Sequence, residues 1–233
     1  MEEFIHTTSL KRKFKKPNVK QVNDFRPVAL MSVLAKCMER MLCRQLVASV
    51  TDRMNSPLQF AYRARRCVED VCLVLVNLIG IHLDKVWIIC VCAVHVFSSA
   101  FNIIRLHLLI KTLRNVNTNN TLVVWIMQFL YNSLKRVSLG GALSDELIVN
   151  TGTPQGCILS PILFSIYTNE VVSTCTLLIL VKFADDVTLF ARLQDKNSLA
   201  EYLLQIDLLT LWFKESFLVL NVSKENKQTK TCV

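Results

Sequence analysis

Two adjacent carboxylates, Asp185 and Asp186, stand between two short apolar runs, Leu177 to Phe183 and Val187 to Phe190. Apolar runs separated by a few turn-forming residues are typical of a tight β-hairpin, with both acids at its tip. Burying two like charges side by side costs free energy, and a cation removes that cost. Because Mg²⁺ prefers carboxylate oxygens, the pair is a candidate metal site. An Asp-rich turn that faces water is the alternative.

A second candidate is the segment Thr151 to Gly156, with the sequence TGTPQG. Two glycines and a proline within these six residues fix a backbone that can approach a ligand closely. Gln155 would then present its side-chain amide to a nucleobase or a sugar. An ordinary turn from a strand into a helix explains the same residues. The order along the chain favours the functional interpretation, because a turn, a helix and the acidic hairpin follow one another.

Hydrophobic periodicity predicts the elements that would position these residues. Helical spacing predicts a long amphipathic helix after Pro27, over Val33–Val50. It predicts five further helices, over Val68–His82, Leu106–Leu113, Leu122–Leu134, from Ser160 and Pro161 onward, and over Ser198–Phe213. Apolar runs predict strands besides the acidic hairpin, over Val86–Phe97, Arg136–Leu139, Leu147–Thr151 and Phe217–Val222. Strands on either side of Gly140 and Gly141 should form a hairpin. Mixed helices and strands without an internal repeat predict one α+β domain.

Composition excludes several classes of protein. The 233 residues carry a net charge of +9, and 52% of them are hydrophobic, which excludes a chain disordered throughout. The longest apolar run, Val86 to Val94, has nine residues, fewer than the roughly 20 that cross a bilayer, so no membrane partner is expected. The N-terminus does not resemble a signal peptide, which favours an intracellular location. Nucleus and cytoplasm both remain open, as does the oligomeric state.

Charged residues and cysteines are distributed unevenly. Residues 1–20 are expected to form a basic leader, which contains Lys11, Arg12, Lys13, Lys15, Lys16 and Lys20. Such a leader either binds a polyanion or is a solvated tail. From Lys85 to Ser144 there is no acidic residue. The nine cysteines are odd in number and lack metal-ligand spacing, so we expect buried free thiols rather than zinc ligands or disulfides.

Six ordered segments then carry a resemblance to a known family. They are Asp24–Leu30, Gln59–Arg63, Phe97–Asn102, Gly152–Pro161, Phe183–Asp186, and Leu218–Asn221 with Lys224. In sequence, order and spacing they resemble the reverse transcriptase domain of non-LTR retrotransposons, the long interspersed class, along nearly the whole chain. The resemblance implies a right-hand polymerase fold over residues 21–233, with fingers in 21–84, and a palm in 85–233 that contains inserted fingers helices. It implies an antiparallel palm sheet packed on helices, with the thumb missing.

The resemblance also implies an activity and roles for individual residues. The activity is DNA synthesis from deoxynucleoside triphosphates on an RNA template and a DNA primer. Asp185 would hold Mg²⁺ or Mn²⁺ with Asp186 as the weaker partner, in a two-metal mechanism that activates the primer 3′-hydroxyl. Phe101 would exclude a ribose 2′-hydroxyl, and Lys224 would donate a proton to pyrophosphate. Other implied contacts are to phosphates, by Arg26, Arg63, Lys15 and Lys16, and to the nascent base pair, by Gln155 and Gly156.

One ligand of the family pattern is missing from this chain. The family's first metal aspartate stands directly before the Phe-Ser-Ser-Ala-Phe segment, where this chain has Val96. Since a valine cannot bind a cation, we expect weak or absent metal binding and slow catalysis. His95 is one position away on a strand and faces the opposite side, so it replaces the aspartate only through a bulge.

The main hypothesis is therefore a polymerase-derived domain that binds nucleic acid and is impaired in catalysis. An active polymerase with a substituted ligand is one alternative. A degraded fragment without function and an unrelated basic nucleic-acid-binding module are the others.

Overall fold

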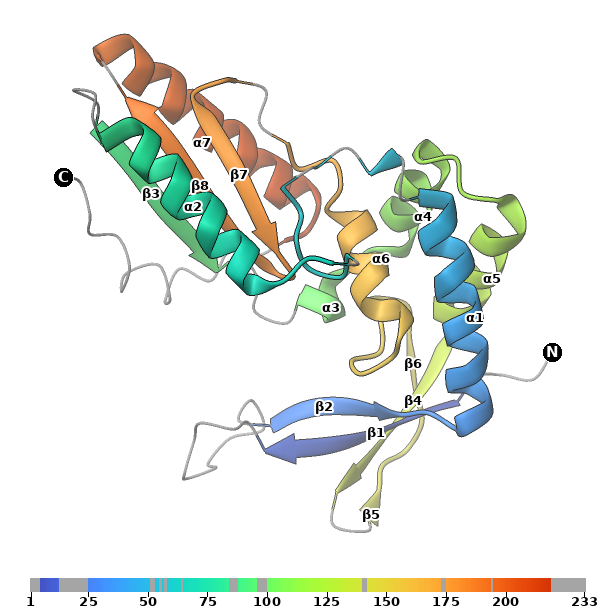
Figure 1. The fold of residues 1–233 in the computed structure, drawn as a ribbon. Helices are drawn as coiled ribbons and strands as arrows, with labels where there is room; N and C mark the ends of the chain where they lie inside the picture. The colour runs from blue at the N-terminus through green and yellow to red at the C-terminus, as the bar shows by residue number, and fades with distance from the viewer. Residues whose placement is uncertain are drawn as a thin grey trace. The chain divides into compact units, whose positions relative to one another are not determined.

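The computed structural model describes residues 5–12, 25–50, 53–54, 56, 58–63, 65–83, 88–95, 100–139, 142–172, 175–193 and 195–218 (Figure 1). The chain divides into two compact units, each built from two separate stretches of sequence. Unit 1 comprises Met1–Arg53 and Phe101–Tyr167, and unit 2 comprises Met54–Ala100 and Thr168–Val233. The boundary between fingers and palm at residue 84 stays a prediction.

Unit 1 contains a five-stranded sheet, with strands in the order β2, β1, β4 and β5, and with β6 also paired to β4. The bounds are β1 Ile5–Arg12, β2 Phe25–Leu30, β4 Ser133–Leu139, β5 Ala142–Leu143 and β6 Leu147–Val149. β1 runs antiparallel to β2 and parallel to β4. The expected basic leader over residues 1–20 thus contains a strand that the sequence did not predict. Its ladder partner β4 lies far away in the sequence, beyond the range of any local pattern.

The helices of unit 1 pack around one apolar helix. They are α1 Val33–Val50, α3 Ala100–Ile103, which begins at the last residue of unit 2, α4 Leu106–Asn115, α5 Asn120–Leu130 and α6 Leu159–Tyr167. All residues of α6 except Pro161 are buried, and α6 contacts both α1 and α4. A helix that is apolar all round belongs in a core, so α6 is the centre of this unit.

The fifth helix ends four residues before its predicted C-terminus. Periodicity predicted a helix to Leu134, whereas α5 ends at Leu130. Asn132 adopts a φ of +49°, a left-handed conformation that ends a helix, and β4 starts at the next residue. The apolar pattern continues from helix into strand because both are buried, and apolar spacing alone does not separate the two.

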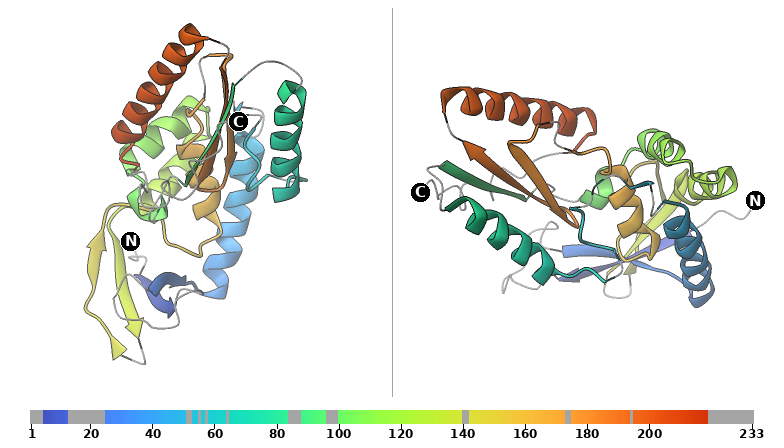
Figure 2. Two further views of the ribbon diagram at one scale, coloured as in Figure 1. Left: turned by 90° about the vertical axis from the view of Figure 1, so that its left-hand side faces the viewer. Right: turned by 45° about the horizontal axis from the view of Figure 1, so that its top comes forward.

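Unit 2 is a three-layer arrangement around an antiparallel sheet. The strands lie in the order β3 Ile88–His95, β8 Asp186–Leu193 and β7 Leu178–Phe183. Helix α2 Val68–Leu83 covers one face of the sheet and helix α7 Lys196–Glu215 covers the other, as both views in Figure 2 show. Most of β8 is buried on both faces as a result, which explains its nearly continuous apolar run. The predicted antiparallel sheet packed on helices is confirmed.

The remaining sequence predictions have mixed outcomes. The helices predicted to begin at Val33, Val68, Leu106 and Ser160 all begin within one residue of those positions. The predicted strand over residues 217–222 lies mostly outside the described residues. None of the described helices is both long and apolar enough to cross a bilayer.

The prediction of buried cysteines is wrong for most of those described. Cys37, Cys67 and Cys72 are exposed, Cys43 and Cys175 are partly exposed, and of these six free thiols Cys157 alone is buried. For Cys37 and Cys43 the reason is that α1 buries only a narrow stripe, Glu39, Leu46 and Val50, and leaves the apolar residues of its other faces in contact with solvent.

Candidate functional site

The acidic pair lies at the end of the unit 2 sheet. Phe183 pairs with Asp186 across the β7–β8 hairpin, so Ala184 and Asp185 form its turn. Asp185 is partly exposed and Asp186 is exposed. Ala184 has a φ of +54°, a conformation that costs a residue with a Cβ roughly 1 kcal/mol. Such local strain often accompanies functional sites, and here it occurs beside the two candidate metal ligands.

The third strand of this sheet ends at the same place. In the antiparallel register of β3 and β8, His95 is the partner of Asp186. Val96 follows directly in the sequence and lies outside the described residues. The chain therefore leaves β3 at the end of the sheet that carries the acidic pair.

A loop of unit 2 runs beside β7 and brings Tyr62 to the acidic tip. The backbone N–H of Lys182 donates to the carbonyl of Leu58, and the N–H of Phe60 donates to the carbonyl of Lys182, both at 2.9 Å. Burial, and then the negative charge of Asp185, raise the pKa of the Tyr62 phenol. The sequence analysis gave Tyr62 no role, and only its place in the Gln59–Arg63 segment drew attention to it.

Lys182 is a buried cation three residues before Asp185. Its side chain is 3% exposed, and its Nζ donates to the carbonyls of Thr168 at 3.1 Å and Val171 at 2.9 Å. Burial, and then the nearby charge of Arg63, lower the pKa of Lys182 to about 8. Lys182 therefore ties β7 to the 168–171 segment directly before the acidic tip.

Arg63, a predicted phosphate contact, is partly buried in the same cluster. Its Nη2 donates to the carbonyl of Met54 at 3.4 Å. Burial, and then the charge of Arg66, lower the pKa of the Arg63 guanidinium. Arg66 itself lies over the ring of Phe60, with its Cζ 4.8 Å from the ring centre. Three basic side chains thus accompany the acids within unit 2.

Replacing Lys182 with methionine is expected to abolish a rise in stability between pH 8 and pH 10.5. In the folded chain Lys182 releases its proton near pH 8, against 10.5 for the usual value. Between these two pH values the unfolded chain binds more protons than the folded chain. The free energy of unfolding of the protein therefore increases with pH, by about 3 kcal/mol at most. Urea unfolding of parent and variant across this range measures the difference. Identical pH dependence in both chains would show that burial does not perturb Lys182.

In unit 1, the TGTPQG turn is fixed by backbone hydrogen bonds to two other segments. The N–H of Thr153 donates to the carbonyl of Phe101 at 2.6 Å. The N–H of Ala29 in β2 donates to the carbonyl of Gln155 at 2.7 Å. The side-chain amide of Gln155 donates to Oδ1 of Asn102 at 3.3 Å. The structure thus brings Gln155 close to the segment that carries Phe101.

Close packing explains why glycine occupies two positions of this turn. Gly156 has a φ of +94°, and a Cβ there would lie 3.3 Å from the Cγ1 of Val28. Gly152 has a φ of +74°, and a Cβ there would clash with backbone atoms of residues 101 and 102. Phe101 packs on Phe164 of α6, with ring centres 5.5 Å apart. Phe101 is therefore held against the core helix of the unit, and the turn is held against the backbone of residues 101 and 102.

Glu39 of α1 is a positioning residue that the sequence analysis missed. It is 1% exposed, and its Oε2 accepts a hydrogen bond of 2.7 Å from the N–H of Ile158, just before α6 begins. Burial, and then the charge of Glu39, raise the pKa of the Cys157 thiol. A carboxylate at a helix N-terminus is favoured by the helix dipole. One signal was available, since Glu39 is the only acid of α1 and is in phase with Leu46 and Val50.

The other predicted site residues fall in several places. Arg26 lies in β2, paired in register with Lys11 of β1. Lys15, Lys16 and Lys224, like Val96, lie outside the described residues. Phe101, Gln155 and Gly156 belong to unit 1, and Asp185, Asp186 and Arg63 belong to unit 2. Within the described ranges, no group of three or more His, Cys, Asp or Glu side chains is placed to hold a metal ion.

Comparisons with known proteins extend along almost the whole chain. The family described as "Reverse transcriptase (RNA-dependent DNA polymerase)" matches residues 14–232. The Pol polyprotein of the type-1 retrotransposable element R1 of Bradysia coprophila is 25% identical over 190 residues, or 76% of this chain. The corresponding polyprotein of the type-2 element R2DM of Drosophila melanogaster is 29% identical over 188 residues, or 74% of this chain. In each case the match covers 17% of the relative.

Solved structures with the same fold come from telomerases. Apo telomerase of Candida tropicalis, truncated from its C-terminal domain, has a TM-score of 0.64 and 14% identity, and covers 94% of this chain and 49% of that one. Telomerase of Candida albicans, in complex with a fragment of telomeric RNA, has a TM-score of 0.64 and 12% identity. The match covers 95% of this chain and 42% of that one. At these identities the likeness concerns the fold.

Proposed function

Because the chain belongs to the reverse transcriptase family, as a domain of the non-LTR retrotransposon kind, we propose that it holds an RNA template with its DNA primer but adds nucleotides very slowly. The observation that carries the proposal is the set of metal ligands at the end of the β3–β8–β7 sheet. Asp185 and Asp186 supply carboxylates from the hairpin, whereas Val96, directly after β3, supplies none.

Reverse transcriptase domains generally use Mg²⁺. Asp185 and Asp186 suit this ion chemically, since both offer carboxylate oxygens, are adjacent in the sequence and reach solvent. Bound metal ions would lower the pKa of the primer 3′-hydroxyl and neutralise charge on the leaving pyrophosphate. With two ligands from a single turn in place of three from two strands, we propose that metal affinity is weakened.

The chain's own residues support binding and positioning. The Gln155 amide, oriented by Asn102, lines a pocket of about 370 Å³ that Lys135 also lines, which suits a contact to a sugar or base edge. Phe101 packs on Phe164, and this contact supports the proposal that its ring excludes a 2′-hydroxyl, because a ring held by packing keeps one orientation. Arg63 and Arg26 are the proposed contacts to phosphates. In this proposal these groups bind and orient the primer–template and the nucleotide, and the step that the chain performs poorly is activation of the primer 3′-hydroxyl.

Primer–template binding and extension together test the proposal. We expect a fluorescent DNA primer annealed to RNA to bind the chain with an affinity that falls at least about tenfold between 50 and 200 mM salt, as phosphate contacts require. We expect no detectable extension with Mg²⁺, and Asp185→Ala should change neither result. Extension by the parent that Asp185→Ala abolishes would refute the proposed impairment. Loss of binding altogether would refute the binding role.

A further inference from the structure

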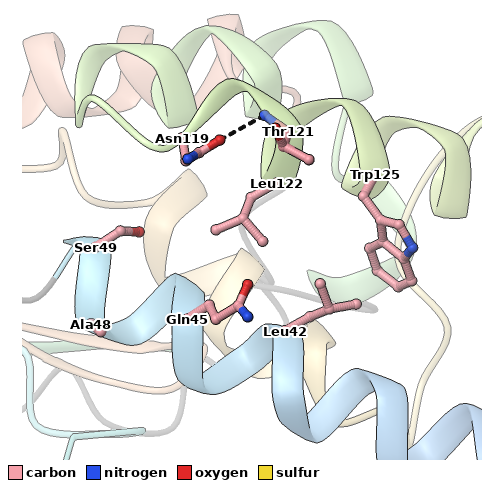
Figure 3. A pocket seen from close by; sticks show the side chains of 8 residues that line it. All are labelled: Leu42, Gln45, Ala48, Ser49, Asn119, Thr121, Leu122 and Trp125. Atoms are coloured by element: carbon pink, nitrogen blue, oxygen red, sulfur yellow. Dashed lines mark hydrogen bonds between the residues drawn. The ribbon is translucent and has the colours of Figure 1, made fainter.

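A groove of about 730 Å³ lies between α1 and α5 in unit 1 (Figure 3). Its walls include Leu42, Gln45 and Ala48 from α1, and Asn119, Leu122 and Trp125 from α5 and its N-cap. It shares no lining residue with the pocket beside Gln155. Its size falls in the range of small-molecule and base-binding sites.

The groove offers the groups that an unpaired nucleobase requires. Leu42 and Leu122 provide apolar walls, and the indole of Trp125 provides a flat aromatic surface at one end. The indole is supported by Phe129, with ring centres 5.3 Å apart and planes at 12°. Stacking on such rings is a common mode of single-strand recognition.

Two side-chain amides accompany the apolar walls. Asn119 uses its Oδ1 to accept a 2.8 Å hydrogen bond from the N–H of Thr121, which leaves its amide nitrogen as a donor. Gln45 is exposed on the facing helix, with its amide turned toward the groove. Amides can both donate to and accept from the edge of a base.

The charge around the groove favours an anionic partner over a cationic one. The only acid of α1, Glu39, is buried against Ile158, and there is no Asp or Glu between Lys85 and Ser144, a stretch that includes all of α5. Arg40 and Arg44 are exposed on α1, one helical turn apart. Neither arginine lines the groove, but Arg44 lies one helical turn before Ala48, which does, and so is at the groove's edge. Both helices are free of exposed carboxylates.

We propose that this groove binds an unpaired base of an RNA strand, with the base against Trp125 and a flanking phosphate at Arg44. The inference rests on the proposed function in one respect, that the domain holds nucleic acid. It adds a second contact surface on a part of unit 1 whose residues the polymerase resemblance did not single out.

Fluorescence of Trp125 tests the proposal directly. The chain has three tryptophans, so a Trp87→Phe, Trp212→Phe variant reports on Trp125 alone. Titration with an oligouridine RNA should quench Trp125 as a base stacks on it. An abasic strand of equal length should bind about tenfold more weakly and leave the fluorescence unchanged, because it has phosphates without bases. Equal fluorescence changes with both strands would overturn the proposal.

A pair of variants at the exposed Ala48 provides a matched control. Ala48→Glu places a carboxylate in the groove and should lower affinity for oligouridine about tenfold, whereas Ala48→Lys, similar in length, should preserve it. Circular dichroism establishes that both fold. Equal affinities would contradict the proposal, and so would quenching by an acidic peptide but by neither RNA, which would assign the groove to a protein partner.

The result also separates this inference from the proposed function. Salt-dependent primer–template binding without any response of Trp125 or Ala48 variants would refute the groove alone. Absence of all nucleic-acid binding would refute both.

Discussion

Replacing Val96 with aspartate is expected to increase primer extension on an RNA template by at least about a thousandfold. In the proposed two-metal mechanism both strands supply carboxylates, and we expect the carboxylate that Val96 does not supply to be worth roughly 4 kcal/mol or more of transition-state stabilisation. Val96 directly follows His95, which pairs with Asp186, so the new carboxylate would stand one position after the strand residue that pairs with an acid of the hairpin. Extension rates of parent and variant with Mg²⁺ measure the effect.

Two further substitutions make the Val96 experiment decisive. Val96→Asn tests polarity without charge and should remain as slow as the parent. Asp185→Ala in the Val96→Asp background should abolish the gained activity, because both strands must contribute. If Val96→Asp binds primer–template normally and extends nothing, the lost carboxylate is not the cause of impairment.

Replacing Gly152 with alanine is expected to lower the free energy of unfolding by about 3 kcal/mol, the size typical of a forced backbone clash. A Cβ there would lie 2.6 Å from the Cα of Asn102 and 2.7 Å from the carbonyl oxygen of Phe101, and the φ of +74° disfavours any side chain. Both neighbours are backbone atoms, so the clash cannot be relieved by turning a side chain.

Gly80→Ala serves as the matched control for this substitution. Gly80 lies in α2, where a Cβ would meet no atom within 4 Å, so alanine should stabilise the helix by up to about 1 kcal/mol. Urea unfolding of both variants gives the comparison. A Gly152→Ala chain as stable as the parent would mean that the turn can move away from residues 101 and 102.

Patterns within a short stretch of sequence predicted the elements whose structure is determined by neighbouring residues. Helix α1 and the β7–β8 hairpin were both predicted, because their periodicity and turn residues lie within a few positions of one another. Strand β1 was not, because its partner β4 is distant in the sequence and its polar composition has no clear alternation. The exposed cysteines were mispredicted because apolar spacing does not show which helix face finds a partner.

The candidate site shows the same division between local and distant information. Asp185, Asp186 and Gln155 lie in motifs that can be recognised from adjacent residues. Glu39 accepts a hydrogen bond from Ile158, which is 119 positions away. The helical phase of Glu39 indicates that it is buried, but a single sequence does not identify its partner. In the sequence Lys182 is an ordinary strand residue, and only its burial in the structure shows that its pKa is lowered.

The parallel pairing of β1 with β4 has a consequence for synthesis of the chain. Ile5 pairs with Leu134, so β1 leaves the ribosome 129 residues before the strand that completes its ladder. At typical translation rates this interval is roughly 6 to 26 s. During that time β1 can pair only with β2, and its other edge offers unpaired backbone groups to any neighbouring nascent chain. We expect chaperones that bind exposed strands to protect this edge until β4 emerges.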